Sequence, residues 1–261
     1  MTTDPQALAD LAGRMADAAG IAIRPHFRAG VAVEAKADAS PVTIADRAAE
    51  QVMRELLLAE VPAHGVRGEE FPWTEGEGAW FWYLDPIDGT KSFICGIPLF
   101  GTLIGLVHDG VAVLGVFDQP ITNERWFAGL DGTATLNGAP ISVSPCAGLD
   151  QAKLFTTGTD YYSPDKAAAF RRLSARVGLT RYGTDAYAFG MLAAGQIDLV
   201  TEADVNEHDV AALVPIIENA GGIVTDWQGA PLRFTGAEVV PSVLAAGDPG
   251  VHAQAMEILN G

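Results

Sequence analysis

One stretch in the first half of the chain limits what the sequence can fold into. The apolar and aromatic run Ala79–Tyr83 is typical of a buried strand, and an Asp-Pro-Ile-Asp-Gly sequence follows from Asp85. Because proline fixes its own φ and lacks a backbone N–H, we expect the strand to end before Pro86. Asp85 and Asp88 should then lie together at the end of a rigid element. Two adjacent carboxylates repel each other strongly unless a cation lies between them.

The simplest interpretation of this stretch is a strand followed by a polar turn, because Asp-Gly pairs are common in turns. The aromatic strand, the second aspartate and the upstream acidic pair Glu69-Glu70 favour a metal site instead. A calcium loop of the EF-hand type is excluded, since the third and sixth positions from Asp85 are Ile87 and Thr90. The two aspartates are also one residue too far apart for an aspartyl-phosphate enzyme of the haloacid dehalogenase type. We therefore expect a hard-metal site beside a phosphate cradle.

The same stretch resembles the signature of a known family. Asp85–Thr90 reads Asp-Pro-Ile-Asp-Gly-Thr, which is similar to the signature of the inositol monophosphatase superfamily. Three further blocks match in family order, within about residues 36–226: Ser40–Asp46, Gly68–Glu70 and Asp209–Gly222. The resemblance implies a layered αβαβα sandwich, an α+β / α/β fold of the inositol monophosphatase or fructose-1,6-bisphosphatase type.

The resemblance also implies roles for individual residues. The implied ligands of two or three Mg²⁺ ions are Glu69, Asp85, the Ile87 carbonyl, Asp88 and Asp209. The N–H groups of Gly89 and Thr90 would bind phosphate at the start of a helix. Thr90 would orient the attacking water while Asp46 accepts a hydrogen bond from its hydroxyl; from local sequence alone, Asp46 reads as a first-turn carboxylate of its helix. Glu70, also assigned to the catalytic group, either reaches a third metal through water or has a purely structural role.

Three residues match the family positions that line the alcohol end of the substrate: Thr184, Asp185 and Glu202. Carboxylates there would suit a cationic alcohol. Asp185 can also be interpreted as the cap of a helix that starts at this point.

Other residues bear on the substrate. Ser92 and His208 differ from the residues usual in inositol monophosphatases, whereas Gly183–Tyr187 and Leu192–Asp198 resemble histidinol-phosphate phosphatases. The sequence therefore predicts a magnesium-dependent histidinol-phosphate phosphatase of histidine biosynthesis. The alternatives are hydrolysis of inositol, sugar or nucleotide phosphates, and a non-catalytic acidic module that binds metal. The roles of His208 and Lys36 stay open.

The charge balance narrows the partners. The 261 residues include 33 acidic and 16 basic side chains, with a formal net charge of −17. The negative electrostatic potential of the protein disfavours binding of nucleic acid and anionic membranes. An anionic phosphate ester could approach only where bound cations make the local potential positive. Cys95 and Cys146 are too few for a disulfide scaffold, which predicts reduced thiols in a cytoplasmic protein. No apolar run approaches the roughly 20 residues of a membrane span, and the resemblance implies a homodimer.

The hydrophobic periodicity predicts an α+β half, residues 1–147, and an α/β half, residues 148–261. The first half should pack two long helices, over 4–28 and 43–60, on a mainly antiparallel sheet and carry most metal ligands. The second half alternates strands and helices, one of them unbroken over 207–220. It should carry the last metal ligand and the substrate residues.

Overall fold

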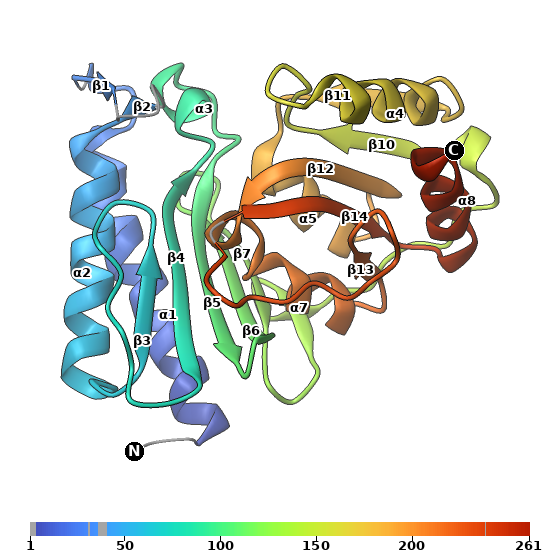
Figure 1. The fold of residues 1–261 in the computed structure, drawn as a ribbon. Coiled ribbons are helices and arrows are strands. Elements are labelled where there is room, and N and C mark those ends of the chain that lie inside the picture. The colour runs from blue at the N-terminus through green and yellow to red at the C-terminus, as the bar shows by residue number, and fades with distance from the viewer. Residues whose placement is uncertain (1–3, 31, 36–40, 238) are drawn as a thin grey trace.

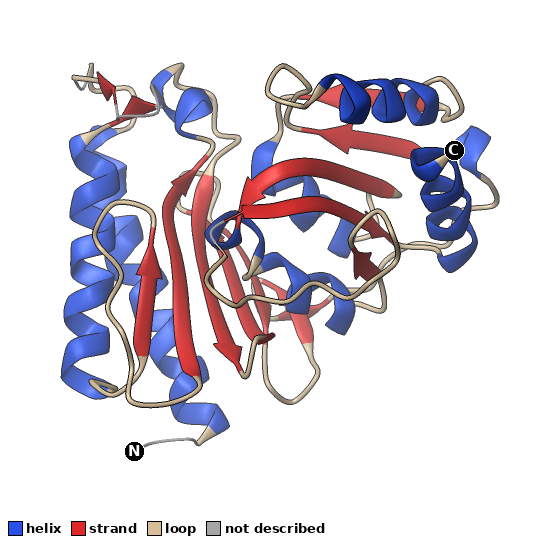
Figure 2. Cartoon of the chain, viewed as in Figure 1, coloured by secondary structure: helices blue, strands red, loops and turns tan. Residues whose placement is uncertain are grey.

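The computed structural model describes residues 4–30, 32–35, 41–237 and 239–261. Lys36, whose role stayed open, lies outside the described residues. Two large sheets alternate with three layers of helices across the molecule (Figure 1), and Figure 2 shows the sheets as separate groups of strands. This arrangement confirms the predicted αβαβα sandwich.

The outer layer on the N-terminal side is a pair of helices, α1 (Pro5–Ile23) and α2 (Ile44–Glu60). Helix α1 ends earlier than predicted, in a 3₁₀ turn (Arg24–His26), because Pro25 has no N–H with which to continue the α-helical ladder. Helix α2 begins with a capping box between the side chains and backbones of Thr43 and Asp46.

The first sheet has seven strands in the order β3-β4-β5-β6-β7-β8-β9, and only β3 and β4 pair in parallel. Its strands are β3 (Gly65–Gly68), β4 (Trp80–Asp88), β5 (Gly101–His108), β6 (Val111–Gln119), β7 (Glu124–Ala128), β8 (Ala134–Leu136) and β9 (Ala139–Pro140). Helix α3 (Thr90–Ile94) follows β4, and β1 (Glu34–Ala35) pairs with β2 (Pro41–Val42) beside it. The mainly antiparallel sheet is as predicted.

The prediction that the central strand ends before Pro86 was wrong. Strand β4 continues to Asp88, which pairs with Gly101, through a register shift between Asp85 and Asp88. The irregularity accommodates the missing N–H of Pro86, while the Thr102 hydroxyl donates to the Pro86 carbonyl at 2.8 Å. Both aspartates therefore stay attached to the sheet.

The second sheet has five strands in the order β11-β10-β12-β14-β13. Its strands are β10 (Lys153–Thr156), β11 (Leu179–Tyr182), β12 (Leu199–Asn206), β13 (Ile223–Thr225) and β14 (Val239–Ala246). The helices of this part are a 3₁₀ turn (Leu149–Gln151), α4 (Pro164–Ser174), α5 (Asp185–Ala193), α6 (Glu207–Val210), α7 (Leu213–Asn219) and α8 (Pro249–Asn260). The predicted unbroken helix over 207–220 is thus two short helices, because Pro215 cannot donate a hydrogen bond to the carbonyl of Ala211.

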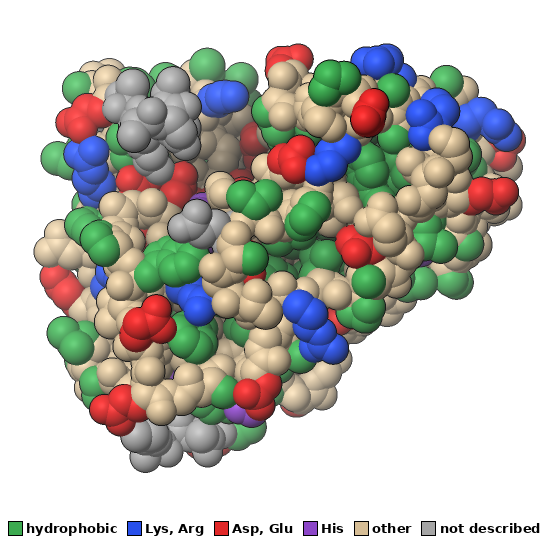
Figure 3. Space-filling view, in the orientation of Figure 1, with side chains coloured by type: hydrophobic (Ala, Val, Ile, Leu, Met, Phe, Trp, Pro, Cys, Tyr) green, Lys and Arg blue, Asp and Glu red, His purple; other side chains and the backbone are tan. Residues whose placement is uncertain are grey.

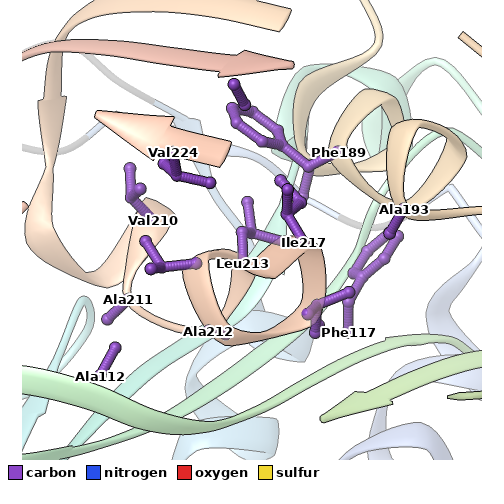
Figure 4. Packing of buried hydrophobic residues seen from close by; sticks show 14 of the residues in the cluster. Ala112, Phe117, Phe189, Ala193, Val210, Ala211, Ala212, Leu213, Ile217 and Val224 are labelled. Atoms are coloured by element: carbon purple, nitrogen blue, oxygen red, sulfur yellow. The ribbon is translucent and has the colours of Figure 1, made fainter. Parts of the chain in front are cut away.

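Three apolar clusters hold the layers together. The first lies between α1, α2 and the first sheet, and the third lies between the second sheet, α4 and α8. The middle cluster joins the two sheets through α5, α6 and α7, and Figure 4 shows Phe117 of β6 near residues of α5 and α7. It contains residues of both predicted halves, so the two halves share one continuous core. None of the described helices is long and apolar enough to cross a membrane.

Candidate active site

A cavity of about 260 Å³ opens where the end of β4 meets α5, β12 and α6. Figure 3 shows this face hollowed between the part that carries α3 and the part that carries α4, with acidic side chains in the recess. The cavity is lined by nine of the predicted site residues: Glu69, Asp85, Ile87, Asp88, Gly89, Thr90, Asp185, Glu202 and Asp209. Asp46, Glu70 and Thr184 are not among the lining residues. The structure therefore brings segments distant in sequence to one place.

Three carboxylates form the centre of this cavity. Oxygen atoms of Asp85, Asp88 and Asp209 all lie within 4.8 Å of one another. Asp85 is fixed by the Ile87 N–H, which donates to its Oδ1 at 3.0 Å, and Asp209 by the Asn206 N–H, which donates to its Oδ2 at 2.9 Å. Asp88 accepts from the Ala186 N–H at 2.6 Å, so backbone groups of β4, α5 and α6 together organise the cluster.

The electrostatics of this cluster call for a cation. Burial raises the pKa of Asp85 well above its usual range, and the nearby Glu69, Asp88 and Asp209 raise it further. Burial likewise raises the pKa of Asp88, and the charges of Asp185 and Asp209 add to the effect. A bound divalent cation would reverse these penalties by stabilising the ionised carboxylates. Oxygen-only donors at this spacing fit a hard ion such as Mg²⁺.

Gly89 joins the end of β4, with its two aspartates, to α3. Its φ of +85° lies in the left-handed region, and it is the N-cap of the helix that begins at Thr90. A Cβ at this position would lie 2.9 Å from the Leu99 carbonyl oxygen and 3.2 Å from Oδ2 of Asp185. The turn therefore requires glycine, and it places the first turn of α3 at the wall of the cavity.

The predicted hydrogen bond between Thr90 and Asp46 is not formed. The Thr90 hydroxyl donates instead to the Ile87 carbonyl at 3.1 Å. Oδ2 of Asp46 accepts from the N–H and the hydroxyl of Thr43, at 2.8 and 2.6 Å, whereas Oδ1 is buried without a hydrogen-bond partner. Burial raises the pKa of Asp46, and Glu69 contributes in the same direction. The local interpretation of Asp46 as a first-turn carboxylate describes this arrangement.

Asp185 lies at one side of the cavity, at the first position of α5, with a φ of +45°. Its Oδ2 accepts from the Ser92 hydroxyl at 3.4 Å, and burial raises its pKa to about 6. The N-cap of this helix is Thr184, which makes no side-chain cap hydrogen bond and whose buried hydroxyl has no partner. Capping is therefore not the role that the structure gives to Asp185.

Glu202 lies on β12 at another wall of the cavity and is 3% exposed. Its carboxylate accepts from the Thr157 N–H at 2.5 Å and from the hydroxyls of Tyr161, Tyr162 and Thr156 at 3.0, 3.3 and 3.2 Å. Burial raises its pKa to about 7. Tyr161 also lines the cavity. Tyr161 was not predicted from the sequence, because no local pattern indicates that the loop after β10 contacts Glu202 on β12.

A second residue that the sequence analysis missed is Glu50 on α2, which is fully buried. One oxygen accepts from the Glu70 N–H at 2.7 Å, and the other accepts from Nε of Arg54 at 2.7 Å. A Cβ on Gly68 would lie 2.0 Å from this carboxylate. Glu50 thus fixes the backbone that carries Glu69. Its spacing of four residues from Asp46, on one face of the helix, was the available signal.

His208, whose role stayed open, lies next to Asp209 of the three-aspartate cluster. Its Nε2 is 3.2 Å from Oδ1 of Asp209, and its side chain is 13% exposed. It lines a separate pocket of about 200 Å³ with Arg67, Trp73 and Glu207, and it is not among the residues that line the main cavity. His208 therefore contacts a carboxylate of the three-aspartate cluster rather than the main cavity.

Comparison with known proteins identifies the family. The profile of the inositol monophosphatase family matches residues 4–260. The chain belongs to the inositol monophosphatase family. This family consists of metal-dependent phosphoric monoester hydrolases that generally use Mg²⁺, so the protein is a phosphoric monoester hydrolase.

The individual relatives are named as phosphatases with different substrates. The chain is 44% identical to a bifunctional phosphatase, chloroplastic, of Arabidopsis thaliana, over 98% of this chain and 76% of that protein. It is 34% identical to the histidinol-phosphatase of Chlorobaculum parvum, over 95% of both chains. Among solved structures, an inositol monophosphatase from Zymomonas mobilis superposes with a TM-score of 0.89 at 42% identity, over the full length of both.

Proposed function

We propose that this member of the inositol monophosphatase family hydrolyses L-histidinol phosphate to L-histidinol and phosphate, with Mg²⁺ as cofactor. The observation that carries the proposal is the pair of carboxylates, the partly buried Asp185 and the buried Glu202, which line the cavity of the three-aspartate cluster. Histidinol phosphate presents an ammonium group and an imidazole to such carboxylates, whereas inositol phosphate presents only hydroxyls. The similarity to histidinol-phosphatases, at 34–35% identity over 90% or more of the chain, supports this choice.

The metal ligands are proposed to be the acidic residues at the cavity floor. Two or three Mg²⁺ ions would be held by Glu69, Asp85, Asp88, Asp209 and the Ile87 carbonyl. Bound metal would neutralise the phosphate and lower the barrier to attack by water. The Ile87 carbonyl already accepts from the Thr90 hydroxyl, and its second lone pair leaves room for a cation.

The remaining residues have positioning roles in this proposal. The N–H groups of Gly89 and Thr90, at the start of α3, bind phosphate oxygens. The unpartnered Oδ1 of Asp46 provides the acceptor that the Thr90 hydroxyl needs once it leaves the Ile87 carbonyl. The pair then orients the attacking water. Glu70 would reach a third ion through water, and Thr184 would offer its buried, unpartnered hydroxyl to the substrate.

The test is a phosphate-release assay on histidinol phosphate and inositol 1-phosphate, each with Mg²⁺ and with EDTA. We expect a higher kcat/KM for histidinol phosphate, and no turnover of either ester in EDTA. Asp185→Asn should lower kcat/KM for histidinol phosphate while leaving inositol phosphate nearly unchanged, because only the first substrate carries a positive charge. A higher kcat/KM for inositol phosphate in the wild-type protein would overturn the proposed substrate.

The second candidate is hydrolysis of inositol 1-phosphate. It is favoured by the 35% identity to a probable inositol 1-monophosphatase of Mycobacterium tuberculosis, over 97% of this chain. The same assay decides between the two substrates. Histidinol as product would place the protein in histidine biosynthesis, and light scattering would test the expected homodimer.

A further inference from the structure

A buried chain of hydrogen bonds lies behind the metal cluster. Nη1 of Arg67 donates to the Tyr83 hydroxyl at 2.5 Å, and this hydroxyl donates to Oε2 of Glu207 at 2.8 Å. Nη1 of Arg67 is also 3.7 Å from the same Glu207 oxygen. Arg67 and Tyr83 are opposite each other in the register of β3 and β4, while Glu207 begins α6. The phenol therefore joins two strands of the first sheet to a helix more than a hundred residues away in sequence.

Arg67, Tyr83 and Glu207 have the same spacing in sequence from the proposed metal ligands. Each precedes a carboxylate by two residues along its own element or the turn that follows it. The carboxylates in question are Glu69 after β3, Asp85 on β4 and Asp209 on α6. A shift within the hydrogen-bonded chain would therefore be passed to three metal ligands through two residues of backbone each.

The network is fixed at both ends. Glu207 is 2% exposed and also accepts from the N–H groups of Thr235 and Gly236, at 2.8 and 3.0 Å. The Arg67 guanidinium lies over the rings of Phe81 and Trp73, at 4.3 and 5.1 Å from their centroids. Removing one partner of such a buried charge pair is costly, because the other charge is left unpaired. The network of Arg67, Tyr83 and Glu207 is therefore a rigid, buried connection rather than a contact on the surface.

Helix α6 needs such a connection. It has only four residues and is separated from α7 by a break, so its own hydrogen bonds hold it weakly. We propose that the Arg67–Tyr83–Glu207 network is a positioning device that sets the place of Asp209 relative to the metal ligands of the first sheet. In this way the Mg²⁺ affinity depends on the Tyr83 phenol, although its hydroxyl has no hydrogen bond to a proposed metal ligand. The inference rests on the metal assignment of the proposed function.

The test variant is Tyr83→Phe, which keeps the buried ring and its edge contact with Phe234, at 5.9 Å between centroids, and removes only the hydroxyl. Loss of a group that orients metal ligands should raise the Mg²⁺ concentration for half-maximal activity by about tenfold. The Mg²⁺ concentration for half-maximal stabilisation against heat should rise in parallel, while kcat at saturating Mg²⁺ stays near the wild-type value. The matched control is Tyr187→Phe, which removes a hydroxyl that donates to Glu124 at 2.8 Å outside the network. It should lower the melting temperature in EDTA and leave both Mg²⁺ titrations unchanged.

The outcomes separate this inference from the proposed function. If Mg²⁺ does not stabilise the wild-type protein, the metal assignment fails and the inference falls with it. If Mg²⁺ stabilises the wild-type protein and Tyr83→Phe gives the same titrations, only the positioning role is overturned. Should Tyr83→Phe not fold, Glu207→Gln provides a second way to break the network, since its amide has one acceptor oxygen instead of two and no charge to pair with Arg67. A raised Mg²⁺ requirement in that variant supports the inference, and an unchanged one overturns it.

Discussion

Replacing Glu202 by Gln should remove a pH dependence of stability that the structure makes calculable. The pKa of this carboxyl rises from 4.5 to about 7 on folding, because the side chain is buried. At 1.36 kcal/mol per pKa unit, the shift corresponds to about 3 kcal/mol. The folded protein binds the proton more tightly than the unfolded chain does. The stabilisation is therefore complete below pH 4.5 and disappears as the pH rises through about 7.

The glutamine variant is a suitable reference because it fits the same contacts. Its amide oxygen can accept from the Thr157 N–H, and its NH₂ group can donate to the hydroxyls of Tyr161 and Tyr162. Urea unfolding in EDTA, at intervals from pH 5 to pH 8, would give the free energy of unfolding of both proteins. EDTA removes metal, and the other cavity carboxylates are common to the two proteins.

Over this pH range we expect the wild-type protein to lose about 2.5 kcal/mol relative to Glu202→Gln. A difference that stays constant from pH 5 to pH 8 would refute the reasoning, since it would mean that Glu202 titrates alike in the folded and unfolded states. A difference that grows in favour of the wild-type protein would refute its sign.

Further predictions concern the metal cluster and its support. Asp88→Asn should abolish turnover and the stabilisation by Mg²⁺, yet raise the melting temperature in EDTA, because one member of a repelling buried cluster becomes neutral; activity assays and calorimetry check both. Gly68→Ala should cost about 1–3 kcal/mol in urea unfolding, because its Cβ would lie 2.0 Å from the buried Glu50 carboxylate. The control Gly13→Ala, on α1 with no atom within 4 Å of the new methyl, should instead stabilise by up to about 1 kcal/mol. The Mg²⁺ concentration for half-maximal activity should rise in Gly68→Ala and not in Gly13→Ala.

The sequence predicted those parts of the site that depend on local rules. The capping box of Thr43 and Asp46 and the turn at Gly89 follow from a few consecutive residues, and both are present. The strand end at Pro86 was predicted wrongly, because local sequence does not show that pairing with β5 resumes at Asp88. Long-range pairing overrides a local strand breaker when a bulge can absorb it.

Glu50 and Tyr161 were not predicted from the sequence for a different physical reason. Glu50 and Tyr161 act on the site across elements, Glu50 from α2 to the end of β3 and Tyr161 from a loop to β12. Their contacts join residues that are 20 and 41 positions apart, and no periodicity encodes such a distance. Burial of a charged side chain is the observation that reveals them, since a buried carboxylate must find donors. Only the folded chain provides that observation.

The same burial links metal binding to the choice of substrate. The charge of Asp185 raises the pKa of Asp88, so the ionisation of the proposed metal ligand and that of the proposed substrate carboxylate oppose each other. Mg²⁺ held by the proposed ligands would favour the ionised forms of both carboxylates. Lys91 acts on Asp185 in the same direction, since its charge lowers the pKa of that carboxyl. In the proposed function, the ammonium group of the substrate would add a further positive charge beside Asp185, whereas a neutral polyol would add none. With Mg²⁺ bound, Asp185 would therefore be ionised and able to pair with the cationic phosphate ester that we propose as the substrate.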